Sequence, residues 1–146
     1  MSETNQNAQL LNFIYQNSQM GVDTITELLD IATDQVFKEH LHAQLKEYRR
    51  IHDKAACMLQ ENGFNEEGLS AFEKIRTYLM INFQTLADDS VSHIAEMLIV
   101  GSTMGVIQAL QNIQKYKEST EPDILALMKD LKQFEENNVE RLKSWL

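Results

Sequence analysis

The residues best suited to chemistry in this chain are carboxylates and histidines at helical spacing. His93 and Glu96 are three residues apart, so on a helix they share one face. An imidazole and a carboxylate placed this way can bind a metal ion, either within one subunit or across an oligomer interface, but such a pair is more often a surface hydrogen bond. The candidate metal ligands are Asp23, Gln44, Glu47, His52, His93 and Glu96.

The pattern that builds a two-metal centre in a helical bundle is missing. Such a centre takes a Glu from each of two helices and a Glu-x-x-His from each of the other two. Here Glu47 is followed three residues later by Arg50, and Glu135 by Asn138; no histidine follows His93. The sequence therefore predicts no metal, no cofactor and no catalytic residue. A metal-binding or ferroxidase-type protein with atypical, degenerate ligands stays open as the alternative.

The chain contains an internal repeat. Residues 17–22 (NSQMGV) return as residues 101–106 (GSTMGV), and residues 45–48 (LKEY) return as residues 131–134 (LKQF) at nearly the same offset. The two repeated segments follow one another in the same order in both halves of the chain, which indicates a duplicated helical hairpin. We therefore expect an all-α protein, a four-helix bundle with an internal pseudo-two-fold.

The repeat also predicts what fills the middle of that bundle. Counting along each helix from the first helix–helix turn places Ser18, Thr103, Phe134 and either Glu47 or Tyr48 near half-height. The rings of Tyr48 and Phe134, which are equivalent in the repeat, would take the volume where two metal ions normally sit. The sequence thus predicts a dry interior of rings and small residues.

Hydrophobic periodicity predicts four long helices, over about residues 8–31, 34–62, 90–117 and 121–146. Residues 1–7 are polar and are expected to form a disordered tail. Thr33 is the expected N-cap of the second helix, with Asp34 in its first turn, and Gly63 follows its end. Ser90 offers an N-cap for the third helix. Packing of Trp145 and of residue 146 is expected to hold the carboxyl terminus.

The connector over residues 65–87 decides the topology. A capping box at residues 70–73 opens a further helix. About 23 helical residues span roughly 30 Å, which is about the length of the bundle. Such a connector carries the chain back, so that the third helix starts at the same end as the second. We expect two hairpins joined by a long helical crossover, in a single domain of residues 1–146.

Composition limits the class of partner. The chain of 146 residues has a formal net charge of −9, which disfavours nucleic acid and anionic lipid. The apolar part of residues 97–114 is too short to span a bilayer and is expected to be the most buried helix, so no membrane is predicted. The single cysteine, Cys57, excludes an intramolecular disulfide and favours a reducing cytoplasm.

The second predicted helix carries a family resemblance. Residues 44–65 contain Gln44-Leu45, an acidic residue after His52, and a helix end before Gly63 and an aromatic residue; residues 20–22 add a small-residue and glycine pattern upstream. This combination resembles the spore coat protein F family, within the ferritin-like superfamily. The resemblance covers about the first 65 residues and implies a structural or accessory role with no assigned reaction.

These observations together predict a non-enzymatic ferritin-like bundle in the cytoplasm or associated with the spore. It is expected to act as a structural or protein-interaction protein, to have protein partners and to form a homodimer. A DNA-protecting miniferritin relative is a third possibility, which the acidic charge and the lack of a basic tail disfavour.

Overall fold

The protein is all-helical wherever its structure is described. The computed structural model describes residues 3–66, 73–84 and 90–146. Within these ranges there is no strand. The elements are α1 (Glu3–Ile31), α2 (Gln35–Glu61), α3 (Glu73–Gln84), α4 (Val91–Tyr116), α5 (Pro122–Leu142) and a terminal 3-10 turn, η2 (Lys143–Trp145).

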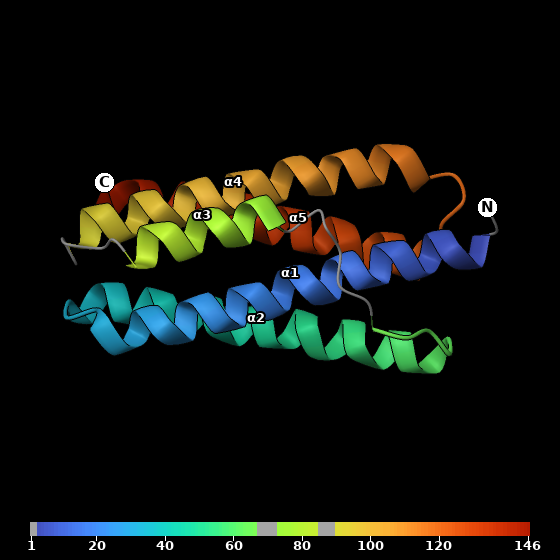
Figure 1. Ribbon diagram of the computed structural model, residues 1–146, viewed down its shortest axis with the longest axis horizontal. Helices are drawn as coiled ribbons and strands as arrows, with labels where there is room; N and C mark the ends of the chain where they lie inside the picture. Colours follow the sequence, from blue (N-terminus) through green and yellow to red (C-terminus); the bar gives the residue numbers. More distant parts are fainter. Residues whose placement is uncertain (1–2, 67–72, 85–89) are drawn as a thin grey trace.

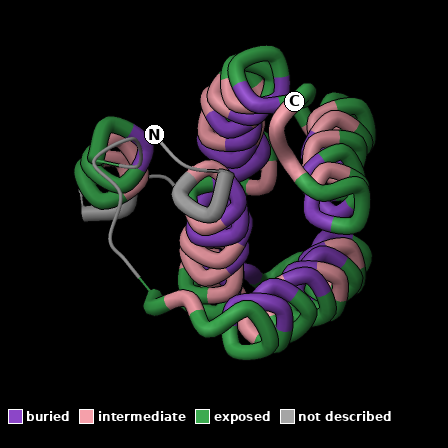
Figure 2. The backbone as a smooth tube through the Cα atoms, turned by 90° about the vertical axis from the view of Figure 1, so that its right-hand side faces the viewer, coloured by how far each residue is buried: buried purple, intermediate pink, exposed green. Residues whose placement is uncertain are grey.

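The four long helices form two antiparallel hairpins, α1 with α2 and α4 with α5 (Figure 1). The shorter helix α3 lies beside the amino-terminal half of α4 and runs antiparallel to it. Helices α2 and α4 therefore start at the same end of the molecule, as predicted. The expected helix over the whole connector, residues 65–87, is wrong at residues 65–66, which are not helical; within the described residues the connector contains only α3, of 12 residues. Seen from one end, the buried residues lie on the inner faces of the helices and the exposed residues on the outer faces (Figure 2).

The helix ends follow local capping chemistry, with one correction. The predicted N-cap Thr33 is wrong: Asp34 is the N-cap of α2, and its carboxylate accepts a 2.8 Å hydrogen bond from the Phe37 amide. A carboxylate satisfies this orphan donor and also carries a negative charge at the positive end of the helix dipole. Ser90 is the N-cap of α4, as predicted. Gly63 follows α2 with a φ of +69°, a conformation that favours glycine.

The prediction of a disordered tail is wrong for residues 3–7, which form the first turns of α1. The side chain of Asn7 is buried, and its oxygen accepts a 3.0 Å hydrogen bond from the amide of Glu121, just before α5. Glu121 is the N-cap of α5, and its own side chain makes no capping hydrogen bond, so this bond ties the start of α5 to α1. Residues 1–2 lie outside the described residues, as do most of the predicted capping box (residues 70–72) and residues 85–89.

The apolar core has two parts. One lies at the end of the bundle where α1 begins and includes Leu10, Phe13, Ile51, Ile113 and Leu127. The other lies at the opposite end and includes Ile25, Phe37, Leu41, Ile94 and Leu142. On α1, α4 and α5 the residues between the two parts include the buried polar side chains Asn17, Ser18, Ser102, Glu135 and Asn138, and on α2 the buried Gln44 lies within the second part, beside Leu45. A polar layer thus crosses the middle of the bundle.

Two expectations about α4 and the carboxyl terminus need correction. α4 is not a uniformly buried helix, because its outer face exposes Ile107 at 51 % and Leu110 at 42 %. Among the described helices, α4 alone is long and apolar enough to cross a membrane, a test that core helices of soluble proteins also pass. At the terminus, Trp145 packs edge-on against Phe37 with ring centroids 5.3 Å apart, as expected, but Leu146 is exposed.

Candidate functional site

The most unusual feature of the polar layer is a carboxylate buried at its centre. The side chain of Glu135 on α5 is only 5 % exposed. Its oxygens accept hydrogen bonds from Tyr48 Oη, Asn17 Nδ2 at 3.5 Å, Ser102 Oγ at 3.5 Å and Asn138 Nδ2 at 3.2 Å. These five residues are called the Glu135 cluster below. Each of the four long helices contributes at least one of them.

Two glycines make room for the cluster. A Cβ atom at Gly21 on α1 would overlap the ring of Tyr48, so only glycine lets that ring lie against the helix. A Cβ at Gly105 on α4 would sit 3.3 Å from Asn17 Oδ1 and 3.5 Å from Glu135 Oε2. Both glycines therefore allow a close approach, against a ring at Gly21 and against polar groups at Gly105.

The predicted pair of rings is present. Tyr48 and Phe134 lie with centroids 4.8 Å apart and planes at 80°, an edge-to-face contact. The expectation that rings and small residues alone fill the interior is wrong, because the Tyr48 hydroxyl donates to a buried carboxylate. Thr103, which was expected at half-height, is exposed, and its neighbour Ser102 points inward in its place.

The cluster perturbs the acid–base behaviour of its two ionisable members. Burial raises the pKa of the Glu135 carboxyl, and the hydrogen bonds from Tyr48, Asn138, Asn17 and Ser102 act in the opposite direction. Burial, followed by the nearby charge of Glu135, raises the pKa of Tyr48 well above its ordinary value of 10. Tyr48 therefore keeps its proton and acts as the donor to Glu135.

A small cavity adjoins the cluster. Its volume is about 30 Å³, and the residues that line it include Gly21, Gly101, Ser102 and Glu135. This is enough for one or two water molecules but far less than the roughly 300 Å³ of a small-molecule site. Within the cluster, Asn138 Oδ1 is buried and has no hydrogen-bond partner among the described residues.

The six candidate ligands from the sequence do not gather at this site. Asp23 is exposed and accepts a 2.9 Å hydrogen bond from Gln19, whereas Gln44 is buried and bonds to His40 at 2.7 Å. Glu47 accepts a 2.7 Å hydrogen bond from Arg50 Nε on the surface of the bundle.

The other three candidates are equally scattered. His52 stacks on Tyr15 with centroids 4.4 Å apart, Glu96 is exposed, and His93 is half-buried near the start of α4. In the described ranges, no three His, Cys, Asp or Glu residues lie close enough together to hold a metal ion. The donor set at half-height, with a single carboxylate and no imidazole, does not fit a two-metal centre.

Sequence reasoning missed Glu135 as a site residue. It considered Glu135 and Asn138 only as a failed Glu-x-x-His pair, yet these are the two polar residues that α5 buries. The signal was available in the apolar stripe of α5, which runs through Leu127, Leu131 and Leu142. At the spacing of that stripe, positions 135 and 138 fall on the buried face.

No protein-family model, curated protein or solved structure matches this chain significantly.

Proposed function

We propose that this protein is a non-enzymatic, ferritin-like four-helix bundle that serves as a structural or protein-interaction protein of the coat-F type. The observation that carries the proposal is the way in which the acceptor sites of Glu135 are used. A carboxylate offers about four acceptor positions, and four neutral donors from α1, α2, α4 and α5 point at this one.

A carboxylate used in this way joins helices and does not present itself to a substrate. Sliding any one helix by a turn, about 5.4 Å, would remove its donor from Glu135 and leave buried polar groups unpaired. Buried polar groups that fix the register of packed helices are known from coiled coils, where they give up stability for specificity. We assign the same architectural role to the Glu135 cluster.

The second candidate function is a metal-binding or ferroxidase-type protein with an atypical, degenerate di-metal site. Two observations favour it: the cavity that adjoins Glu135, and the unpartnered Asn138 Oδ1, an oxygen of the kind that hard cations accept as a ligand. Against it stands the donor set, which has one carboxylate where a two-metal centre uses several.

The proposal includes a cellular setting. We place the protein in the cytoplasm, because its single cysteine, Cys57, fits a reducing compartment. An association with the spore is also proposed, because about the first 65 residues resemble the spore coat protein F family. The proposed partners are proteins, including a second copy of this chain, and the net charge of −9 disfavours nucleic acid.

The experiment that separates the two candidates is elemental analysis of the purified protein, with Fe(II) oxidation followed by absorbance. We compare the wild-type chain with Glu135→Gln, which keeps the shape of the side chain and removes its charge. The proposal expects well under one equivalent of iron, manganese or zinc in both proteins, and the same rate of Fe(II) oxidation as buffer. One equivalent or more in the wild type that is lost in Glu135→Gln would establish the metal-binding alternative.

A further inference from the structure

A regular stripe of residues follows the outer face of α4 for most of its length. Its members recur at alternating steps of four and three residues, the 3.5-residue period of a coiled-coil contact line. They are Glu96, Val100, Thr103, Ile107, Leu110, Gln114 and Lys117. This set is called the α4 stripe. Val100 is half-buried, and the other six members are exposed.

Within residues 3–66, 73–84 and 90–146, no other helix packs over this stripe. α3 packs on another side of α4, where Leu79 lies against Gly101, and the face that α4 turns to the bundle carries Leu98, Ser102 and Ala109. Ile107 and Leu110, at the centre of the stripe, are among the most exposed large apolar residues of the described chain.

The distribution of charge along the stripe is informative. The chain is 24 % charged with a net charge of −9, yet residues 97–114 contain no charged residue. Two acidic copies of this protein would repel one another over most of their surface, and the α4 stripe is a place where they can approach without that cost. The two charges that it does carry have opposite signs and stand at opposite ends: Glu96 at the start and Lys117 just after the helix.

We infer that the α4 stripe is the contact surface of a symmetric homodimer, in which α4 packs antiparallel against α4 of a second copy. A two-fold axis that passes beside Ile107 places Ile107 of one copy against Ile107 of the second copy. It also brings Thr103 against Leu110 of the second copy, and Val100 against Gln114. A two-fold interface must be self-complementary in this way.

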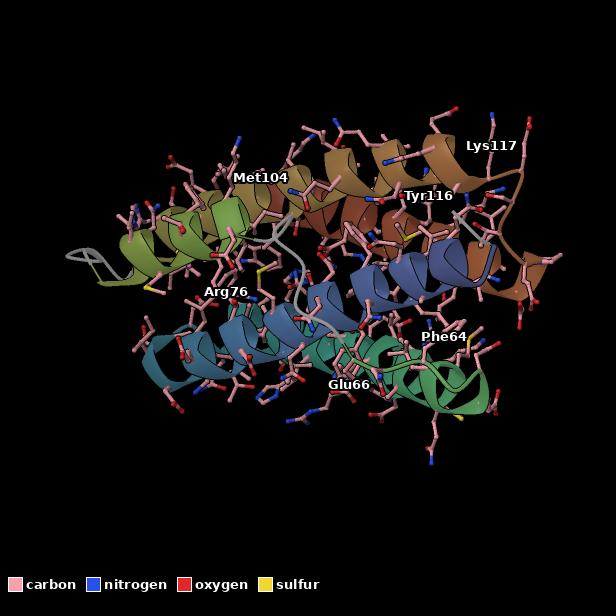
Figure 3. All side chains as sticks on the ribbon, turned by 45° about the vertical axis from the view of Figure 1, so that its right-hand side comes forward. Phe64, Glu66, Arg76, Met104, Tyr116 and Lys117 are labelled. Carbon is pink, nitrogen blue, oxygen red and sulfur yellow. The ribbon has the colours of Figure 1, made fainter. Side chains whose placement is uncertain are left out.

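The same rotation matches the charges. Glu96 then lies beside Lys117 of the second copy, and the symmetry makes this ion pair twice. A parallel arrangement would instead put Glu96 against Glu96 and Lys117 against Lys117. Lys117 lies at the carboxyl end of α4 with its side chain directed away from the bundle (Figure 3), and within its own chain its ammonium donates to the exposed Gln114 at 3.2 Å. The stripe is roughly 32 Å long at helical rise, which is enough for six or seven contact layers.

The inference deepens the proposed function and rests on it, since a protein that works through its surfaces needs one that specifies a partner. The two can nevertheless fail separately. A dimer that holds stoichiometric metal would overturn the proposed non-enzymatic function and leave this interface intact. A monomer without metal would overturn this interface and leave the non-enzymatic role intact.

Cysteine cross-linking tests the axis of the dimer. In a Cys57→Ser background, Ile107→Cys is expected to form a disulfide-linked dimer under mild oxidation, because the two cysteines meet on the two-fold axis. Thr103→Cys is the matched control on the same stripe: its two copies would stand roughly 12 Å apart along the helices, beyond the reach of a disulfide. Mixing Thr103→Cys with Leu110→Cys should restore the cross-link. Equal cross-linking of all the single variants, or none, would overturn the inference.

Charge reversal tests the orientation by sedimentation or light scattering. Glu96→Lys and Lys117→Glu should each raise the dimer dissociation constant by roughly tenfold, and the double reversal should restore it. Ile107→Lys, a change at an exposed position, should raise it by roughly 100-fold without loss of helicity by circular dichroism. A wild-type monomer at tens of micromolar, or a monomer that floats with phosphatidylcholine vesicles, would overturn the inference; the second result would assign the stripe to lipid.

Discussion

The two hairpins use equivalent positions of the repeat in different ways. In the first hairpin Ser18 bonds within its own helix, to the carbonyl of Ile14 at 2.7 Å, while its counterpart Ser102 reaches across the bundle to Glu135. Gly21 makes room for a ring, whereas its counterpart Gly105 lies against polar groups. Equivalent residues of the two hairpins therefore have different neighbours in the packed bundle.

The difference arises from a rotation of α5 relative to α2. Leu45 and Leu131 are equivalent and both are buried. After Leu45 the next buried residue of α2 is three positions on, at Tyr48, but after Leu131 the next on α5 is four positions on, at Glu135. The counterpart of Glu135 in the repeat is Arg49, which is exposed. One hairpin supplies the ring and the other the carboxylate, so a repeat in sequence need not give a symmetric interior.

The largest effect should come from removing the carboxylate. Glu135→Leu leaves the donors of Tyr48, Asn17, Ser102 and Asn138 without an acceptor, and we expect a loss of about 3–5 kcal/mol in the free energy of unfolding. The control Arg49→Leu, at the equivalent exposed position, should change it by less than about 0.5 kcal/mol. Urea denaturation measures both. Similar losses in the two variants would show that the hairpins are energetically equivalent and that the comparison is wrong.

The two glycines should respond unequally to the same substitution. Alanine gains about 1 kcal/mol over glycine in a helix interior. At Gly21 the added methyl overlaps the Tyr48 ring, which Glu135 and Phe134 hold in place, so we expect a net loss of about 1–3 kcal/mol.

At Gly105 an added methyl would lie 3.3 Å from Asn17 and 3.5 Å from Glu135, so these side chains need to shift by only a few tenths of an ångström. Gly105→Ala should therefore stay within about 1 kcal/mol of the wild type. Thermal unfolding of the two variants side by side gives the answer, and a greater loss at Gly105 would contradict the geometry.

A smaller effect than that of Glu135→Leu should come from the Tyr48 hydroxyl. Tyr48→Phe removes one hydrogen bond to a buried carboxylate and should cost about 1–2 kcal/mol near neutral pH. The folded state raises the pKa of Tyr48, so this group contributes stability that is complete below the unfolded pKa of about 10 and is lost as pH rises through the folded value. Stability measured at rising alkaline pH should thus fall more steeply in the wild type than in Tyr48→Phe. Parallel curves would show that Tyr48 does not hold its proton in the folded state.

Local signals in the sequence were enough for the helices and for their order. The caps at Ser90 and Gly63, the proline that opens α5, and a connector long enough to return the chain were all readable. These features depend on residues close together in sequence. The error at Thr33 is of the same local kind, since two adjacent capping residues compete and the structure uses Asp34.

The interior of the bundle was less predictable, because it depends on how each helix is rotated about its axis. The rotation of α5 buries Glu135 and leaves Phe134 half-buried beside Tyr48, whereas the repeat pointed only to Phe134. The sequence also gave no reason to bury an acid without a cation. The structure explains this, because neutral donors from the long helices surround the acid.

The separation of the cluster members along the chain has a kinetic consequence. Each hairpin can form from neighbouring helices, but Asn17 and Glu135 are 118 residues apart and meet only when the first helix docks on the last. The loops that this contact closes are nearly as long as the chain itself, so the contact is expected after the hairpins during folding. Disruption of the cluster should then appear mainly as faster unfolding in stopped-flow experiments, with the refolding rate little changed.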